Sequence, residues 1–213
     1  MESGFIVVAV NYRLAPENKF PAAVLDSMQA LQWLHDNALK LGVDARKVFV
    51  AGESAGGNLA VSTVINSVTS ENNVKYPIAG LVSIYPALDP ELKRASHFEY
   101  SNLSGTLKLE TMQWFWDLYL NTKEDENNYL AAPLKAKTMS LQRFPKTYLL
   151  LAKYDILLDE GLELAKLLTE NGVDVDMLIY NNTVHGFFGR YGFYSGQEAL
   201  IRVSSWLKSI ADK

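Results

Sequence analysis

Short apolar runs alternate along the chain with longer segments in which apolar residues recur at helical spacing. The runs predict strands buried on both faces, at residues 5–10, 47–51, 79–85, 147–152 and 173–180. Helices are predicted at residues 21–41, 55–68, 159–170 and 197–210. Because strands separated by helices need crossover connections, the pattern predicts the α/β class, with a mainly parallel sheet and helices on both faces.

The segment from about residue 89 to 130 breaks this alternation. It holds the aromatic run from Trp114 to Tyr119, which we predict to be helical. Aromatic residues at helical spacing either fill a core or line an apolar pocket, and the sequence favours neither. No linker divides the chain and no repeat occurs in it, so we predict one domain over residues 1–213, with a partial cap or insert at about 89–130.

The composition limits the classes of partner that the protein can bind, and it adds nothing to the predicted fold. The chain has 213 residues, a formal net charge of −4 and no cysteine. The acidic balance argues against nucleic acid or an anionic membrane as a partner, and the lack of cysteine excludes disulfides and thiolate metal sites. The apolar run 5–10 is far shorter than the ~20 residues that cross a bilayer, so we expect no membrane partner and a cytoplasmic location. We see no metal-binding, phosphate-binding or dinucleotide motif and expect no cofactor.

The first candidate catalytic motif is Gly52-Glu53-Ser54-Ala55-Gly56. It lies between the predicted strand 47–51 and the predicted helix from 55. Gly-x-Ser-x-Gly in this context is the pattern of a nucleophile elbow, a strained turn that lifts the serine hydroxyl clear of the sheet. We expect glycine at both flanks, Gly52 and Gly56, to allow the close approach of strand and helix. The N–H of Ala55 would then point to where an oxyanion forms.

A serine hydroxyl needs a base, and the chain has three histidines. His35 falls within a predicted helix and is most simply an exposed helical residue. His97 falls among polar residues of the insert. His185 follows the last predicted strand, and ligands meet open α/β sheets at the carboxyl ends of the strands. We therefore predict His185 as the base, with a plain surface-loop histidine as the alternative.

The third member should be a carboxylate that orients the imidazole. Asp155 follows strand 147–152 and precedes His185, which is the chain order of this type of site. Asp159 and Glu160 come four and five residues later, where negative charge favours the start of a helix. We predict Asp155 as the orienting acid. The alternative makes Asp155 a turn residue and Asp159 the partner.

Six stretches together resemble the hormone-sensitive-lipase-like branch of the α/β-hydrolases, which includes many bacterial carboxylesterases. They run in family order along essentially the whole chain, at residues 11–17 (NYRLAPE), 20–23 (FPAA), 52–59 (GESAGGNL), 85–86 (YP), 155–161 (DILLDEG) and 185–187 (HGF). The resemblance implies the α/β-hydrolase fold and a triad of Ser54, Asp155 and His185, with Ala55 giving one oxyanion-hole amide. It further implies hydrolysis of short- to medium-chain acyl esters.

Substrate contacts are predicted less directly. The aromatic insert, joined by the residues after His185, would form an apolar cover suited to an acyl chain. We take Glu53, Trp114 and Phe187 as candidates for substrate binding. Glu53 stands where the branch usually has Asp or Thr, and we infer no substrate from that difference.

The family's upstream His-Gly-Gly-Gly loop, which supplies the other oxyanion amides, does not occur in this sequence. The resemblance therefore implies that the N-terminal strands and this loop are missing. A gap is then expected between strands 5–10 and 47–51, to be closed by movement of strand 5–10, by a partner chain as in a homodimer, or not at all. Three alternative functions stay open beside the esterase: a catalytically impaired chain, a ligand-binding homologue like the family's hormone receptors, and an amide or formamide hydrolase.

Overall fold

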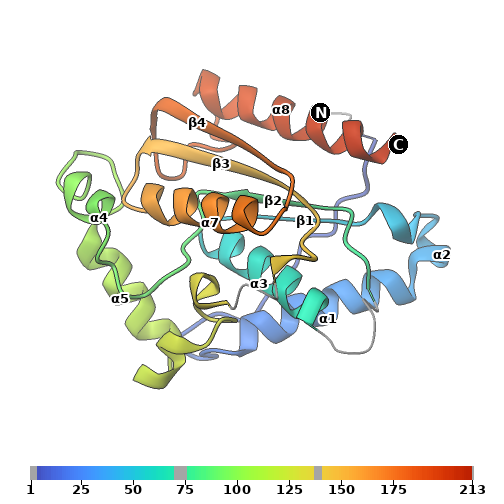
Figure 1. Cartoon of the computed structure of the whole chain (residues 1–213), viewed down its shortest axis with the longest axis horizontal. Coiled ribbons are helices and arrows are strands. Elements are labelled where there is room, and N and C mark those ends of the chain that lie inside the picture. Colours follow the sequence, from blue (N-terminus) through green and yellow to red (C-terminus); the bar gives the residue numbers. More distant parts are fainter. Residues whose placement is uncertain (1–3, 70–75, 137–140, 213) are drawn as a thin grey trace.

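The computed structural model describes residues 4–69, 76–136 and 141–212. Within these ranges a single parallel sheet has the strand order β1-β2-β3-β4, so each strand pairs with its neighbour in sequence (Figure 1). Their bounds are β1 Phe49–Glu53, β2 Gly80–Ile84, β3 Lys146–Tyr154 and β4 Val175–Val184. The α/β class and the parallel sheet that the sequence predicts are confirmed.

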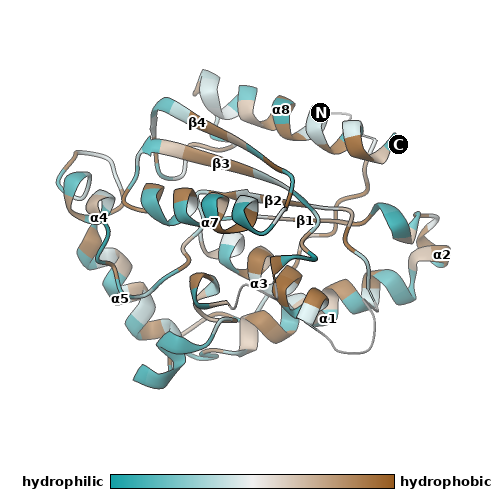
Figure 2. Ribbon diagram, in the orientation of Figure 1, coloured by the Kyte–Doolittle hydropathy of each residue, from teal (hydrophilic) through white to brown (hydrophobic). Residues whose placement is uncertain are grey.

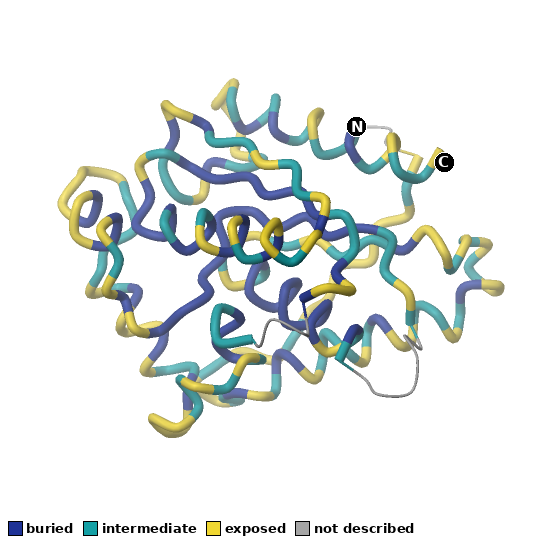
Figure 3. Tube along the Cα trace, in the orientation of Figure 1, coloured by how far each residue is buried: buried dark blue, intermediate teal, exposed yellow. Residues whose placement is uncertain are grey.

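Helices cover both faces of the sheet because its strands carry apolar residues on both sides. Leu81 and Leu149 face α3 (Ala55–Thr69) and α7 (Leu158–Glu170) in one buried cluster. The alternate positions Val82 and Leu150 belong to a second cluster with Trp206 of α8 (Tyr194–Ala211). Figures 1 and 2 show α8 on one side of the sheet and the largely apolar α3 on the other, and Figure 3 shows the central strands buried.

The predicted helix 21–41 is two helices. The first, α1 (Ala22–Asp36), packs on α3 and ends at Asn37, whose side-chain amide donates to Trp33 O at 2.8 Å. A second short helix, α2 (Ala38–Leu41), ends at Gly42 in the left-handed conformation, followed by a 3₁₀ turn at Ala45–Lys47. Local capping therefore divides a segment that hydrophobic periodicity alone treats as continuous.

The insert folds over the carboxyl ends of the strands. It contains α4 (Ala95–Glu99), α5 (Leu109–Tyr119) and a 3₁₀ turn at Lys123–Asn127, and a further 3₁₀ turn follows it at Pro133–Lys135. Met112 and Trp116 of α5 are buried in a cluster with Ile156 and Leu157. The aromatic helix is thus confirmed, and its inner face is core.

The strand predicted at 5–10 is wrong: these residues have no strand assignment and are mostly exposed, with Ile6 62% and Val7 82% exposed. The ring of Phe5 meets that of Phe49 edge-on at 5.6 Å, so the segment runs near β1. The described sheet nonetheless has β1 at its edge. A β-branched run becomes a strand only where a neighbour accepts its backbone hydrogen bonds.

No helix in the described ranges has both the length and the apolar character required to cross a membrane.

Candidate active site

Ser54 occupies the sharp turn between β1 and α3 with φ of +54°, a value that is strained for a residue with a side chain. Its N–H donates to Ile84 O at 2.9 Å, which fixes the turn to the neighbouring strand. A Cβ on Gly52 would lie 2.1 Å from Gly56 O, so glycine is required there. The predicted need for Gly56 is wrong, because a Cβ there meets nothing within 4 Å. Gly57 has the tight contact instead, at 2.9 Å from Pro86 Cβ.

Ser54, His185 and Asp155 form one hydrogen-bonded chain. Ser54 Oγ lies 2.9 Å from His185 Nε2, and His185 Nδ1 lies 2.6 Å from Asp155 Oδ2. With the ring proton on Nδ1, the imidazole donates to the carboxylate and leaves Nε2 to accept from the serine. The structure therefore brings together the three residues that the sequence pairs as nucleophile, base and orienting acid.

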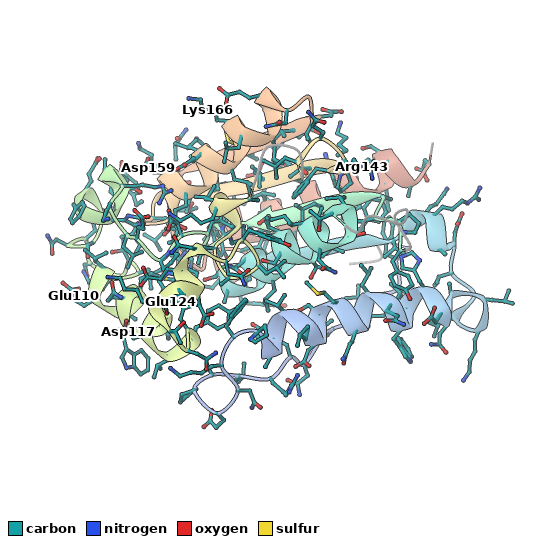
Figure 4. All side chains as sticks on the ribbon, turned by 60° about the horizontal axis from the view of Figure 1, so that its bottom comes forward. Glu110, Asp117, Glu124, Arg143, Asp159 and Lys166 are labelled. Atoms are coloured by element: carbon teal, nitrogen blue, oxygen red, sulfur yellow. The ribbon has the colours of Figure 1, made fainter. Side chains whose placement is uncertain are left out.

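Burial and backbone contacts hold Asp155 in place. Its side chain is fully buried, whereas that of His185 is 14% exposed. Asp155 Oδ1 accepts from the N–H of Leu157 at 3.0 Å, which leaves Oδ2 for the imidazole. The alternative partner, Asp159, accepts from the N–H of Ser96 at 2.8 Å at the start of α7 (Figure 4). Asp155 rather than Asp159 is thus the carboxylate that meets His185.

Tyr85 packs directly against the imidazole, with its ring centroid 4.7 Å from that of His185. Its hydroxyl donates to Glu53 and accepts from the N–H of Phe188 at 3.3 Å. Burial and the Glu53 carboxylate raise the pKa of Tyr85, so it stays a neutral donor. The sequence motif Tyr85-Pro86 marks this position, but its contact with His185 was not predicted.

The predicted substrate-binding residues lie in three different environments. Glu53 is exposed on β1 and holds the Tyr85 hydroxyl. Phe187 is 2% exposed and packs on Tyr85 and Tyr180, as part of the core. Trp114 is 56% exposed and lines a surface hollow of about 420 Å³ that no triad residue lines. Their roles in substrate binding stay predictions.

That hollow lies along the outer side of α5. Glu110 and Asp117 line it together with Glu91, and Figure 4 shows the first two on this helix. In the parts of the chain that the structure describes, this hollow included, no group of three or more metal-ligating side chains could hold an ion.

Two histidines differ from their predicted surroundings. His35 is half-buried rather than exposed, with its ring 5.4 Å from that of Tyr76. His97 is fully buried and pairs with Glu160, although its sequence neighbours are polar. Both are buried by segments distant in the chain, which local sequence does not reveal.

Residues 1–189 match a protein family described as having the alpha/beta hydrolase fold. The chain is 32% identical over 186 residues to an ethyl acetate hydrolase from Pseudomonas putida, covering 87% of this chain and 57% of that protein. It is 33% identical over 207 residues to an arylesterase from Saccharolobus solfataricus, covering 96% and 64%.

Solved structures agree with the sequence relatives. An esterase from Pyrobaculum calidifontis matches with a TM-score of 0.91 and 40% identity, over 98% of this chain and 67% of that one. The chain spans about half to two thirds of the length of the curated relatives that it matches.

Proposed function

The chain belongs to the alpha/beta hydrolase family, and we propose that it is a serine carboxylesterase that acts on small acyl esters. The observation that carries the proposal is the continuous hydrogen-bonded chain Ser54–His185–Asp155, at 2.9 and 2.6 Å. The relatives named for ethyl acetate and aryl ester hydrolysis support the same reaction class.

In the proposed mechanism, Ser54 Oγ attacks the ester carbonyl while His185 Nε2 takes its proton. The same imidazole returns the proton to the leaving alcohol, and an acyl-enzyme forms on Ser54. Water then attacks the acyl group while His185 Nε2 takes its proton. The bond between the acyl carbon and Ser54 Oγ breaks, the imidazolium returns the proton to Ser54 Oγ, and the carboxylic acid leaves. Asp155 keeps the ring in the required tautomer and stabilises the imidazolium.

The oxyanion that forms during attack needs N–H donors. Ala55 opens α3, and first-turn amides of a helix have no intrahelical acceptor, so its N–H is available. The positive end of the helix adds favourable electrostatics at the same point. We propose Ala55 N–H as one oxyanion donor and short- to medium-chain acyl groups as the substrate range.

The test compares the wild-type chain with Ser54→Ala in hydrolysis of p-nitrophenyl butyrate and in labelling by a fluorophosphonate. Loss of the nucleophile should lower kcat by roughly 10³-fold or more and abolish labelling. Ser209→Ala is the matched control, because Ser209 lies on α8 and donates to Trp206 O. Labelling that persists in Ser54→Ala would contradict the assignment of the nucleophile.

The same two assays distinguish the alternative functions from one another. Labelling without turnover would indicate an impaired oxyanion hole, and neither labelling nor turnover would favour a ligand-binding protein. Faster cleavage of the butyryl anilide than of the matching ester would indicate an amidase. A p-nitrophenyl series from acetate to decanoate reports the acyl range directly.

A further inference from the structure

A second pair of ionisable residues lies buried beside the triad. The side chains of His97, on α4, and Glu160, in the first turn of α7, have no exposed surface. His97 Nε2 lies 2.8 Å from Glu160 Oε1. A buried carboxylate is costly unless it is fully hydrogen-bonded, so the contacts around Glu160 are informative.

Those contacts fix where the protons lie. The N–H of Arg94 donates to His97 Nδ1 at 2.9 Å, so the neutral ring carries its proton on Nε2 and donates it to Glu160. The other carboxylate oxygen, Oε2, accepts from the N–H groups of Leu88 and Asp89, the latter at 2.9 Å. Burial raises the pKa of Glu160, and the hydrogen bonds from His97 and from the N–H of Leu88 oppose that effect.

One end of this arrangement holds the turn that carries Asp155. Ser96, next to His97, donates from Oγ to Ile156 O at 2.7 Å. Its N–H donates to Asp159 Oδ2 at 2.8 Å. Helix α4 and the start of α7 are therefore one hydrogen-bonded unit with Glu160 inside it.

The other end reaches the nucleophile. Leu88 and Asp89 directly follow Ala87, whose N–H donates to Ser54 O at 3.3 Å. The side chain of Asn58 donates to Ala87 O at 2.8 Å and fixes the same segment to α3. Glu160 thus joins the segment beneath Ser54 to the turn that holds Asp155.

We propose that Glu160, which accepts a hydrogen bond from the Nε2–H of His97, is a positioning residue. It holds Asp155 and His185 in line with Ser54. It touches no reacting atom, and the inference rests on the proposed function of the triad. Without its contacts, the Asp155 turn and the segment 87–89 lose their shared anchor. Misplacement of a catalytic group by about 1 Å can cost 10²-fold in rate.

Glu160→Gln is the informative substitution because it keeps the shape and changes the donors. If the new amide oxygen accepts from Leu88 and Asp89, the amide N–H₂ faces the Nε2–H of His97, and two donors meet. His97 has no way to switch tautomer, since Arg94 donates to its Nδ1. We expect kcat and the rate of fluorophosphonate labelling to fall by about 10- to 100-fold, with KM changed by less than about twofold.

Glu163→Gln is the matched control. Glu163 lies on the same helix and accepts from Arg94 Nε at 2.7 Å, but its side chain is 45% exposed. It should keep the wild-type kcat and KM. Ser96→Ala is the milder second variant, because it leaves the pair of His97 and Glu160 intact. It removes the hydrogen bond from Ser96 Oγ to Ile156 O and the one that Ser96 Oγ accepts from the N–H of Asp159 at 3.2 Å, and we expect a severalfold fall in kcat.

The imidazole N–H proton signals in NMR give a readout that needs no turnover. Glu160→Gln should change the signal of His97 and also that of the His185 proton bonded to Asp155. A folded Glu160→Gln with wild-type kcat and an unchanged His185 signal would overturn the proposal, as would unchanged kcat in Ser96→Ala if Glu160→Gln does not fold. A wild-type chain that neither labels nor turns over would instead overturn the proposed function.

Discussion

The turn at Ser54 requires that residue 52 have no side chain, and Gly52 meets this requirement. A Cβ there would lie 2.1 Å from Gly56 O and 2.3 Å from its carbonyl carbon. Both are backbone atoms, so a Cβ at position 52 could fit only if α3 moved away from β1. We expect Gly52→Ala to lower the free energy of unfolding by several kcal/mol and to abolish hydrolysis, as measured by urea unfolding and the butyrate assay.

Gly56→Ala is the control for that prediction, because it lies in the same motif and a Cβ there meets nothing within 4 Å. Alanine favours helix over glycine by up to about 1 kcal/mol, so the variant should be as stable as the wild type or slightly more stable. An equal loss in the two variants would show that the motif is sensitive for a reason other than this contact.

The hydrogen-bonded arrangement of Ser54, His185 and Asp155 could be predicted from sequence because the three residues follow recognisable strand ends in a fixed order. Gly52 could be predicted because it belongs to the Gly-x-Ser-x-Gly motif around Ser54. Gly56 and Gly57 are adjacent, and only the position of Pro86 shows that the second one is in tight contact. The role of Glu160 was missed because a carboxylate at a helix start also has a simple electrostatic explanation.

At the scale of elements, an ion pair between Arg13 and Asp26 holds the segment before α1 against that helix. Arg13 donates to Asp26 from its backbone N–H at 2.9 Å and from its guanidinium, with Nη2 to Oδ1 at 2.7 Å. These hydrogen bonds lower the pKa of Asp26. The stabilisation is therefore complete above the unfolded-state pKa of about 3.9, and it is lost as the pH falls through the lower folded-state pKa.

Asp26→Asn should therefore reduce stability slightly at pH 7, and its difference from the wild type should shrink as the pH falls below about 4. Urea unfolding at pH 7, 5, 4 and 3 measures this. Asp36→Asn, an exposed change on the same helix, should stay within about 0.5 kcal/mol of the wild type. A difference for Asp26→Asn that is constant with pH would contradict the role of its charge.

Most elements could be predicted from hydrophobic periodicity, since buried strands and amphipathic helices have different periods. Two kinds of feature could not. The break between α1 and α2 at Asn37 depends on side-chain capping, which hydrophobic periodicity does not reveal. The state of residues 5–10 depends on whether another strand lies beside them, and a local pattern contains no information about neighbours.

At the scale of the whole molecule, the sheet ends at β1, and in the described part of the chain no strand pairs with its outer edge. The exposed apolar residues Ile6, Val7 and Val8 belong to the segment that runs near that strand, as the contact between Phe5 and Phe49 shows. An open sheet edge beside exposed apolar side chains favours pairing between chains. We therefore expect the protein to self-associate as its concentration rises.

Val7→Lys tests this expectation, because Val7 is 82% exposed and a lysine there places charge beside the edge. Sedimentation velocity over a concentration series should show weaker association than in the wild type. Leu39→Lys is the matched control, since Leu39 is 97% exposed on α2, and it should associate as the wild type does. Equal weakening in both variants would indicate general charge repulsion, and a wild-type chain that stays monomeric throughout would contradict the prediction.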